Sequence, residues 1–508
     1  MFNWKGCRVK KSLFFLLALL QLSVCAGAQN EGRVTILHTN DMHAQFVPLP
    51  ATWIDSDPQP LIGGMVALEV AVRQARATFP HVLLLDAGDI STGTLLSRID
   101  YNGALNGGFV EMMNLIGYDA CTIGNHEFDD GQINLATLID LARFDVLSAN
   151  LLIHNKLFAP HAYKIYNIGK IRVGVIGLIL TDLFSVAAKK QLENVIVADP
   201  VTTAQKIIDK IDHETDLIIL LTHQGDDQDI KLAQRIQNAD IIVGGHSHTR
   251  INSARQENGM LIVQAGSKTR YLGRLTVDVK GDTVASFDSE LIPTWVDSVA
   301  EPHPEMVALV DKFQMHITAE YGQQIGTLKT AWKSHNQYET NLGNFLTDVM
   351  RDYGASDFAL LNSGGIRKSL PAGPITKMDI MEILPFTNYL TTFACSGSLL
   401  ADILQNDLKG ALNNGYGLFQ ISGINYAYQI DADGSAHIVS IAIAGQPIDH
   451  QKIYTGTTVD FVVNNLQDHY QLKNITYSPD IIADIVIESI AKNSIIESRV
   501  EGRIRRVR

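Results

Sequence analysis

The chain has 508 residues, which exceeds the span of one ordinary hydrophobic core and favours two domains. Hydrophobic residues make up 46% and charged residues 19%, without a long polar or repetitive tract, and this composition excludes a largely disordered chain. The formal net charge of −13 argues against polymeric nucleic acid as a partner, because binding that polymer relies on basic surface. A small phosphorylated substrate remains compatible with this charge, since bound metal ions reverse the sign of the local field.

Residues 1–28 are typical of a secretory signal peptide. Four basic residues precede the apolar run at 13–22, and small residues suited to cleavage stand at 26–28. The run is about a dozen residues long, whereas a spanning helix needs about 20, and no later stretch is long and apolar enough to span a bilayer. Cleavage would change the formal charge from −13 to −17. We therefore expect an exported protein, periplasmic or secreted, with lipidation of Cys25 as the alternative.

The next part of the chain repeats one pattern, in which a short apolar strand ends in acidic, amide or imidazole side chains. The pattern occurs five times: Asp41 and His43 follow the strand at 34–37, Asp89 follows 82–85, Asn125, His126 and Asp129 follow 120–123, His223 follows 217–221, and His246 and His248 follow 241–243. Such apolar runs are typical of strands buried on both faces, whose carboxyl ends converge. Helical patterns at 64–78, 132–142 and 202–213 lie between them, so we expect an α/β domain.

These strand ends predict a metal site. A single Asp or His at a strand end is more often a cap or a satisfied core group than a ligand, but five such loops, with five of the 16 histidines, make that interpretation poor. Asp, Asn and His together suit zinc, manganese or iron, whereas calcium prefers oxygen alone. Cys121 and Cys395, which would survive cleavage, form no Cys-x-x-Cys pair and lie far apart, so we expect neither a structural zinc nor a disulfide.

The succession D-x-H, G-D, G-N-H-E, T-H and G-H-S-H resembles the calcineurin-like metallophosphoesterase superfamily. The resemblance implies two ions, one held by Asp41, His43, Asp89 and His248, the other by Asp89, Asn125, His223 and His246, with Asp89 bridging. It also implies that His126 faces the phosphate or the leaving oxygen while Asp129 orients its ring. A helix N-cap is the alternative role for Asp129. Nucleotidase relatives often carry an amide at position 248 and other branches carry His, so the exact branch stays open.

Prolines at 293, 302 and 304 and a helical pattern at 305–321 indicate a domain boundary. Beyond it, a helix is expected at 341–353 and a strand at 358–361 that opens into N-S-G-G-I-R. That motif would by itself suit a Gly-rich turn with a surface Arg. Together with I-L-P-F at 383–386, it resembles the carboxyl-terminal substrate domain of the 5′-nucleotidase family, so the resemblance spans nearly the whole mature chain.

The resemblance implies that the nucleotide is held by Asn362, Arg367, Phe386 and Tyr470, the two aromatic rings stacking on the base. Two departures bear on this assignment. Relatives usually carry G-G-D-G before the second aromatic residue, where this chain has N-L-Q-D-H at 465–469, and Asn336 stands where relatives often have an anion-binding Arg. We therefore expect that base stacking and phosphate binding can both differ from those of the relatives.

The expected architecture is a layered α/β/β/α metallophosphoesterase domain at 31–295, a linker helix at 296–325 and a smaller α/β substrate-binding domain at 326–508. The expected activity is 5′-nucleotidase: release of phosphate from nucleoside 5′-monophosphates by attack of a metal-bound hydroxide. Two divalent ions are expected, zinc first, with manganese or another divalent ion as the alternative. Alternatives within the family are a 2′,3′-cyclic nucleotide phosphodiesterase with 3′-nucleotidase activity, mildly favoured by His248, and a UDP-sugar hydrolase. A non-catalytic nucleotide-binding protein is the alternative from another class, although such a protein has no need of a complete ligand set.

Overall fold

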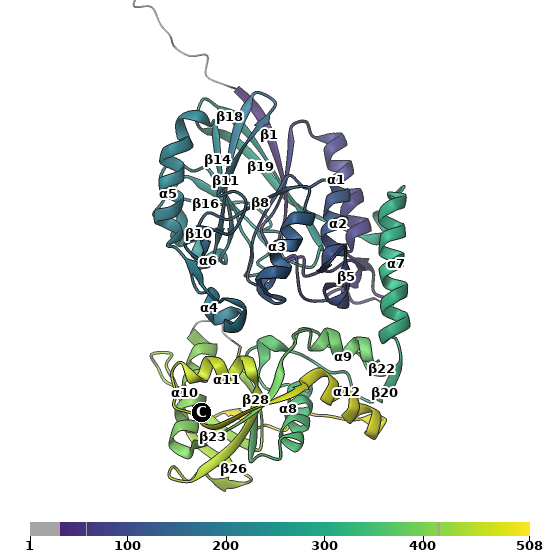
Figure 1. Ribbon diagram of the computed structural model, residues 1–508, viewed down its shortest axis with the longest axis vertical. Coiled ribbons are helices and arrows are strands. Elements are labelled where there is room, and N and C mark those ends of the chain that lie inside the picture. The colour runs from purple at the N-terminus through teal and green to yellow at the C-terminus, as the bar shows by residue number, and fades with distance from the viewer. Residues whose placement is uncertain (1–30, 57, 414–416, 508) are drawn as a thin grey trace, which may run out of the picture.

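The computed structural model describes residues 31–56, 58–413 and 417–507, and it folds into two lobes (Figure 1). We use "first lobe" for the elements from β1 to β19 and "second lobe" for those from β20 to β31. The predicted signal peptide and Cys25 lie outside the described residues. The boundaries at 295 and 325 remain predictions.

The first lobe contains two six-stranded sheets. The first sheet has the order β19-β18-β1-β4-β7-β8, with β1 (Glu31–Thr39), β4 (Val82–Asp86), β7 (Ala120–Thr122), β8 (Asp145–Leu147), β18 (Tyr271–Lys280) and β19 (Val284–Pro293). The second has the order β11-β12-β14-β15-β17-β16, with β11 (Tyr163–Ile168), β12 (Ile171–Ile179), β14 (Leu217–His223), β15 (Ile241–Val243), β16 (Arg255–Glu257) and β17 (Met260–Val263). The central strands of each sheet run parallel, so their carboxyl ends lie at one edge.

Alternation along β4 explains why its sequence is a continuous apolar run. Leu83 and Leu85 belong to the hydrophobic core between the two sheets, whereas Leu84 belongs to the core beneath the helices. A strand with both faces buried cannot show the apolar-polar alternation of a half-exposed strand. The expected double burial is therefore confirmed.

Helices cover both outer faces of the sheet pair. The helices α1 (Met65–Thr78), α2 (Gly107–Ile116) and α3 (Gly131–Leu141) contribute to the core on the first sheet, and α5 (Pro200–Ile211) and α6 (Asp226–Ala233) to the core on the second. The α5 helix begins with the signals expected of an N-terminus, because Asp199 accepts a hydrogen bond from the Thr202 N–H and Pro200 stands at the first helical position. The predicted α/β/β/α layering is confirmed.

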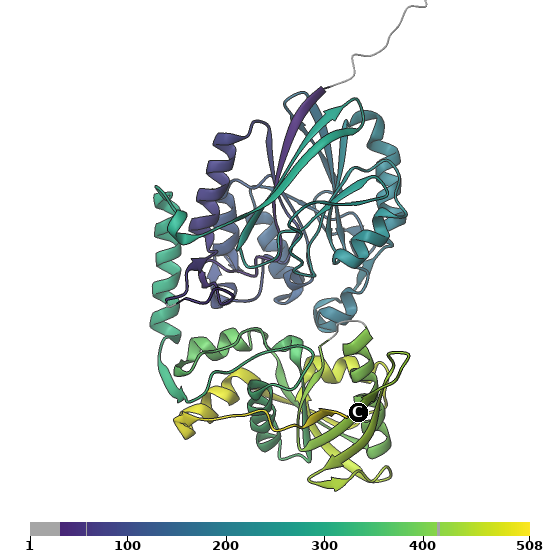
Figure 2. The same cartoon turned by 180° about the vertical axis from the view of Figure 1, so that it is seen from behind.

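Helix α7 (Pro304–Tyr321) connects the lobes. Its buried residues Met306, Val310, Phe313 and Ile317, spaced by three or four positions, pack into the same core as the helices on the first sheet. Figure 2 shows α7 running beside the first lobe and leading down to the second. The helix predicted at 305–321 thus exists and belongs by its packing to the first lobe.

The second lobe is built around a five-stranded sheet of order β24-β21-β28-β23-β29. Its strands are β21 (Phe358–Asn362), β23 (Tyr389–Ser396), β24 (Phe419–Ser422), β28 (Ile453–Val459) and β29 (Lys473–Ile481); the smaller sheets use β20 (Gln324–Leu328), β22 (Gly373–Thr376), β30 (Ile495–Ile496), β25 (Ile424–Ile430), β26 (Ala436–Ile443), β27 (Gln446–Pro447) and β31 (Ile504–Arg506). The helices are α8 (Asn341–Tyr353), α9 (Lys377–Ile383), α10 (Gly397–Asn413), α11 (Asp460–Gln467) and α12 (Ile482–Asn493).

The sequence predicts neither a disulfide nor a membrane-spanning stretch after residue 28. Cys121 and Cys395 are both free and buried. Among the helices at 31–56, 58–413 and 417–507, none combines the length and apolar character that a membrane crossing requires.

Candidate active site

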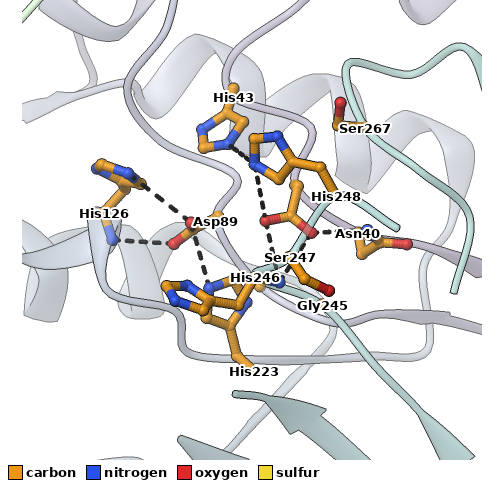
Figure 3. Close-up of polar contacts among 12 residues, drawn as sticks. Asn40, His43, Asp89, His126, His223, Gly245, His246, Ser247, His248 and Ser267 are labelled. Atoms are coloured by element: carbon orange, nitrogen blue, oxygen red, sulfur yellow. Dashed lines mark hydrogen bonds and ion pairs between the residues drawn. The ribbon is translucent and has the colours of Figure 1, made fainter. Parts of the chain in front are cut away.

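Polar side chains from both sheets of the first lobe meet at the carboxyl ends of their strands (Figure 3). Three groups have ligand atoms within 4.8 Å of one another: Asp41, His43 and His248; His43, Asp89 and His126; and Asp89, His223 and His246. The first sheet supplies the residues that follow β1, β4 and β7, and the second supplies those at the ends of β14 and β15. The structure therefore brings together residues that the sequence distributes over five loops.

Left-handed backbone conformations turn the chain into the site directly after the strands. Asp41, His43, Asp89, His246 and His248 all have φ between 50° and 78°. Non-glycine residues adopt this region rarely, at a cost of about 1 kcal/mol or more each. Five such residues in one cluster indicate that the surrounding fold holds the side chains in these positions.

Two glycines allow the ligand loops to pack backbone against backbone. A Cβ added at Gly124 would lie 2.3 Å from Asp89 Oδ1, and one added at Gly245 would lie 2.6 Å from the carbonyl oxygen of Ala87. No side chain fits at either distance. The glycines in G-N-H-E and G-G-H-S-H thus set the spacing of the loops.

The first donor group is centred on His43 and His248, whose Nε2 atoms lie 2.9 Å apart. His43 Nδ1 faces the Thr92 carbonyl at 2.9 Å, so a ring that donates from Nδ1 would present the lone pair of Nε2 to a metal. Asp41 Oδ1 lies 3.3 Å from His248 Nε2, and Asn40 Nδ2 donates to Asp41 Oδ2 at 2.6 Å. Asn40 therefore positions the carboxylate of Asp41, a role that the sequence did not reveal.

The second donor group surrounds Asp89 and Asn125. His223 Nε2 lies 3.2 Å from Asp89 Oδ2, and its Nδ1 is directed at the Ala87 carbonyl at 2.7 Å. Asn125 Oδ1 lies 2.9 Å from His246 Nδ1 and 3.3 Å from His223 Nε2. A carboxylate oxygen of Asp89 also lies within 4.8 Å of a ring nitrogen of His43, which belongs to the first group.

Within these groups, the carboxylates and imidazoles shift the pKa values of their neighbours. Burial opposes ionisation of Asp41, but His248 outweighs it and lowers the pKa of Asp41 to about 2. Burial is likewise outweighed at His223, where Asp89 raises the pKa to about 10. For His246, burial and the neighbouring His223 lower the pKa to about 4. Carboxylates and imidazoles held this close form a donor set that suits a divalent cation.

His126 stands at the edge of the donor groups. Its Nδ1 lies 2.8 Å from Asp129 Oδ2, and its Nε2 lies 3.9 Å from Asp89 Oδ2. Burial would lower the pKa of His126, but Asp129 and Asp89 together raise it above its ordinary value. The N-cap residue of α3 is Asp130, so Asp129 contacts the imidazole instead of capping that helix.

Glu127 is a buried residue whose role the sequence did not reveal. One carboxylate oxygen accepts the backbone N–H groups of Asp89 and Gly124 at 2.9 and 2.7 Å, and the other accepts that of Ser91 at 3.0 Å. Glu127 therefore joins the loops after β4 and β7. The motif G-N-H-E was a signal for this residue, but two of its three partners, the N–H groups of Ser91 and Asp89, lie 36 and 38 positions away.

The second lobe contributes two residues to the site. The Phe386 ring stacks on His126, with a centroid distance of 5.6 Å and an interplanar angle of 23°. The Arg367 guanidinium lies 5.9 Å from the Phe386 ring centroid. Burial lowers the pKa of Arg367, and the carboxylates of Asp89, Asp129 and Asp41 oppose that shift, so Arg367 faces the donor groups.

The other two residues assigned to the nucleotide, Asn362 and Tyr470, also belong to the second lobe. Asn362 ends β21, and its buried Oδ1 has no hydrogen-bond partner among the described residues. Tyr470 accepts a hydrogen bond from Asn406 Nδ2 at 2.6 Å through its hydroxyl. Within the described part of the chain, no ring contact joins Tyr470 to Phe386.

Each of the two lobes is similar to proteins of known families. The family model for calcineurin-like phosphoesterase matches residues 34–250, and the model for the 5′-nucleotidase C-terminal domain matches residues 324–473. A 5′-nucleotidase from Bos taurus is 28% identical, over 93% of this chain and 90% of its own length. The trifunctional nucleotide phosphoesterase protein YfkN of Bacillus subtilis is 27% identical over 93% of this chain, which spans 35% of that longer protein.

Among solved structures, the 5′-nucleotidase precursor from Thermus thermophilus is similar in fold. It superposes with a TM-score of 0.83 at 26% identity, and the match covers 94% of this chain and 99% of that one. The similarity therefore extends over both lobes.

Proposed function

Because the chain belongs to the 5′-nucleotidase family, with a calcineurin-like phosphoesterase domain followed by a 5′-nucleotidase C-terminal domain, we propose that it releases phosphate from nucleoside 5′-monophosphates. The chain is a metal-dependent hydrolase of phosphoric esters. The observation that supports the substrate is the stacking of Phe386, from the second lobe, on His126 beside the donor groups. Residues suited to phosphate hydrolysis and an aromatic side chain suited to base stacking thus lie in one site.

The residues of the first lobe divide into two ligand sets in our proposal. Asp41, His43, Asp89 and His248 hold one divalent ion, and Asp89, Asn125, His223 and His246 hold the other. When bound, the two ions lower the pKa of a water and offset charge on the phosphoryl oxygens. Asp89 would belong to both sets, because its carboxylate lies near donor atoms of each.

His126 acts on the phosphate or on the leaving oxygen. Asp129 holds Nδ1, which directs Nε2 into the site and fixes the orientation of the ring. Asp129 and Asp89 raise the pKa of His126 against the effect of burial, and this favours the imidazolium form, which can donate a proton or a hydrogen bond. His126 thereby stabilises developing negative charge.

The second lobe selects the nucleoside in this proposal. Phe386 offers an aromatic face on which every base can stack, and Arg367 offers a positive charge to the phosphate. Asn362 has a buried, unpaired Oδ1 that can accept a hydrogen bond from the ligand. Tyr470 is the second stacking residue, which requires a change in its position relative to Phe386.

We further propose that the bound metal is zinc and that the protein is exported. Imidazole and carboxylate donors suit zinc, with manganese as the other candidate. The basic, apolar and small-residue pattern at 1–28 supports export to the periplasm or the medium.

The experiment is a phosphate-release panel of nucleoside 5′-monophosphates, 2′,3′-cyclic nucleotides and UDP-sugars, with and without a chelator. We expect AMP or another 5′-monophosphate to be turned over fastest, and the chelator to remove the activity. Preferred turnover of a cyclic nucleotide would identify the phosphodiesterase instead. Stoichiometric nucleotide binding without turnover in metal-loaded protein would contradict an enzymatic function.

A further inference from the structure

Gln264 directly follows β17, and its side chain is fully buried, at 0% exposure. The side chain contacts the loop after β15 at three alternate residues. Its Nε2 donates to the Gly245 carbonyl at 3.0 Å, and its Oε1 accepts the Ser247 hydroxyl at 3.0 Å and the Thr249 N–H. Gln264 therefore bonds to the residues before, between and after the two histidines of the motif G-H-S-H.

The loop after β15 folds back on itself around these contacts. It leaves β15 beside β17, where the Gly244 N–H donates to the Val263 carbonyl at 2.9 Å. It returns against the chain that follows β17, where the Gly266 N–H donates to the Thr249 carbonyl at 3.1 Å. The Gln264 side chain thus joins the outgoing and the returning arm of this loop.

The two histidines of this loop depend on such support. His246 and His248 have φ of 78° and 55°, in the left-handed region that persists only where the surrounding structure enforces it. Figure 3 shows the two rings in different donor groups, His246 with His223 and His248 with His43. Hydrogen bonds on both sides of each histidine restrict its backbone dihedral angles, and these angles decide where the imidazole points.

The same contacts reach the loop after β14. Ser247 Oγ also accepts the N–H of Asp226, the first residue of α6, at 3.1 Å. The Gly245 carbonyl accepts the Gly225 N–H at 3.0 Å in addition to Gln264 Nε2. Gln264 therefore holds two groups that tie the loops after β14 and β15 to each other.

We propose that Gln264 is a positioning residue for both divalent ions. This inference rests on the ligand sets of the proposed function, in which His248 belongs to one set and His246 to the other. Because one side chain holds the backbone around both histidines, its loss should weaken the two ions together. Outer contacts of metal ligands typically change metal affinity about 10- to 100-fold.

A purely structural role is the other explanation for a buried glutamine, and Gln420 in the second lobe is a matched case. Gln420 is 1% exposed and also makes three hydrogen bonds. Its Oε1 accepts the N–H and the hydroxyl of Thr340 at 2.9 and 3.1 Å, and its Nε2 donates to the Tyr338 carbonyl at 3.0 Å. Gln264→Met and Gln420→Met therefore remove equivalent contacts, but only the first pair of loops carries metal ligands.

The test measures Zn²⁺ affinity by competition with a chelating dye. Gln264→Met keeps the approximate length of the side chain, removes its hydrogen bonds and should weaken both ions by about 10- to 100-fold. Gln420→Met should lower the urea midpoint of unfolding and change neither affinity by more than about twofold. Ser247→Ala alters an exposed side chain, so it should fold normally, and it should weaken both ions by about 3- to 10-fold.

Visible spectra of the Co²⁺-loaded protein give a readout that follows ligand geometry and depends neither on stability nor on turnover. At saturating Co²⁺, Gln264→Met should change the band positions or intensities, and Gln420→Met should not. Wild-type affinities in Gln264→Met or in Ser247→Ala, weakening of one ion alone, or equal losses in Gln420→Met would overturn the inference. A wild-type protein that holds two ions in a Gln264-dependent manner yet hydrolyses no nucleotide would overturn the proposed function and leave the positioning role standing.

Discussion

Replacement of Glu127 by Gln tests whether one buried carboxylate holds the ligand loops together. The amide oxygen can take the place of the oxygen that accepts the Asp89 and Gly124 N–H groups, but its NH₂ then faces the Ser91 N–H. One charged hydrogen bond, worth about 1.5–3 kcal/mol, is lost, and two become neutral and weaker. A neutral amide is cheaper to bury than a carboxylate, which offsets part of the loss. We expect a net destabilisation of about 2–4 kcal/mol.

The same substitution should weaken metal binding, because the Asp89 backbone loses its anchor. Loss of such an outer contact typically lowers metal affinity about 10- to 100-fold. The assays are the urea midpoint of unfolding and metal affinity by competition with a chelating dye. Glu214→Gln, at a residue with an exposed side chain, is the control and should shift neither. A Glu127→Gln protein with wild-type midpoint and wild-type metal affinity would refute the assigned role.

Three further predictions concern catalysis and one concerns stability. Asp89→Asn should fold yet lose most bound metal, as measured by elemental analysis; normal metal content would exclude a bridging carboxylate. His126→Ala should retain the metals and slow turnover by about 10²–10⁴-fold, and loss of the metals would make His126 a ligand. Phe386→Ala should raise KM for AMP by the equivalent of about 1–3 kcal/mol, while hydrolysis of an aryl phosphate stays nearly constant. Equal losses of activity on AMP and on the aryl phosphate would contradict the stacking role. Burial raises the pKa of Asp407 to about 7, so the folded state keeps a proton that the unfolded chain releases near pH 4, and stability falls as pH rises between these values. Asp407→Asn should therefore gain about 2–4 kcal/mol over the wild type at pH 8 and less at pH 5, by urea midpoints; an equal effect at both pH values would contradict the shift.

The ligand residues could be predicted because they directly follow apolar runs. In β4, β14 and β15 the burial of both faces leaves a continuous apolar sequence, and the first polar residue marks the carboxyl end. Because the central strands within each sheet run parallel, their carboxyl ends lie at the same edge of that sheet. The α8 helix was found at its full length, Asn341–Tyr353, because its apolar spacing is regular.

Residues that act through backbone groups of distant loops escaped prediction. The roles of Asn40 and Glu127 depend on carbonyl and N–H groups of other loops, which only tertiary packing brings near. The contact of Phe386 with His126 depends on how the lobes meet, which local patterns do not encode.

The origin of the donor groups from both sheets gives the ions a mechanical role besides their chemical one. Asp41 and Asp89 follow strands of the first sheet, whereas His223 and His246 belong to the second, and His43 and His248 stand 205 positions apart. Ions bound there would cross-link the two layers, as disulfides do in other proteins, whereas Cys121 and Cys395 are free and buried. Metal binding then adds directly to the free energy of folding. Metal supply would thus govern not only whether the hydrolase turns over substrate but how long its first lobe survives.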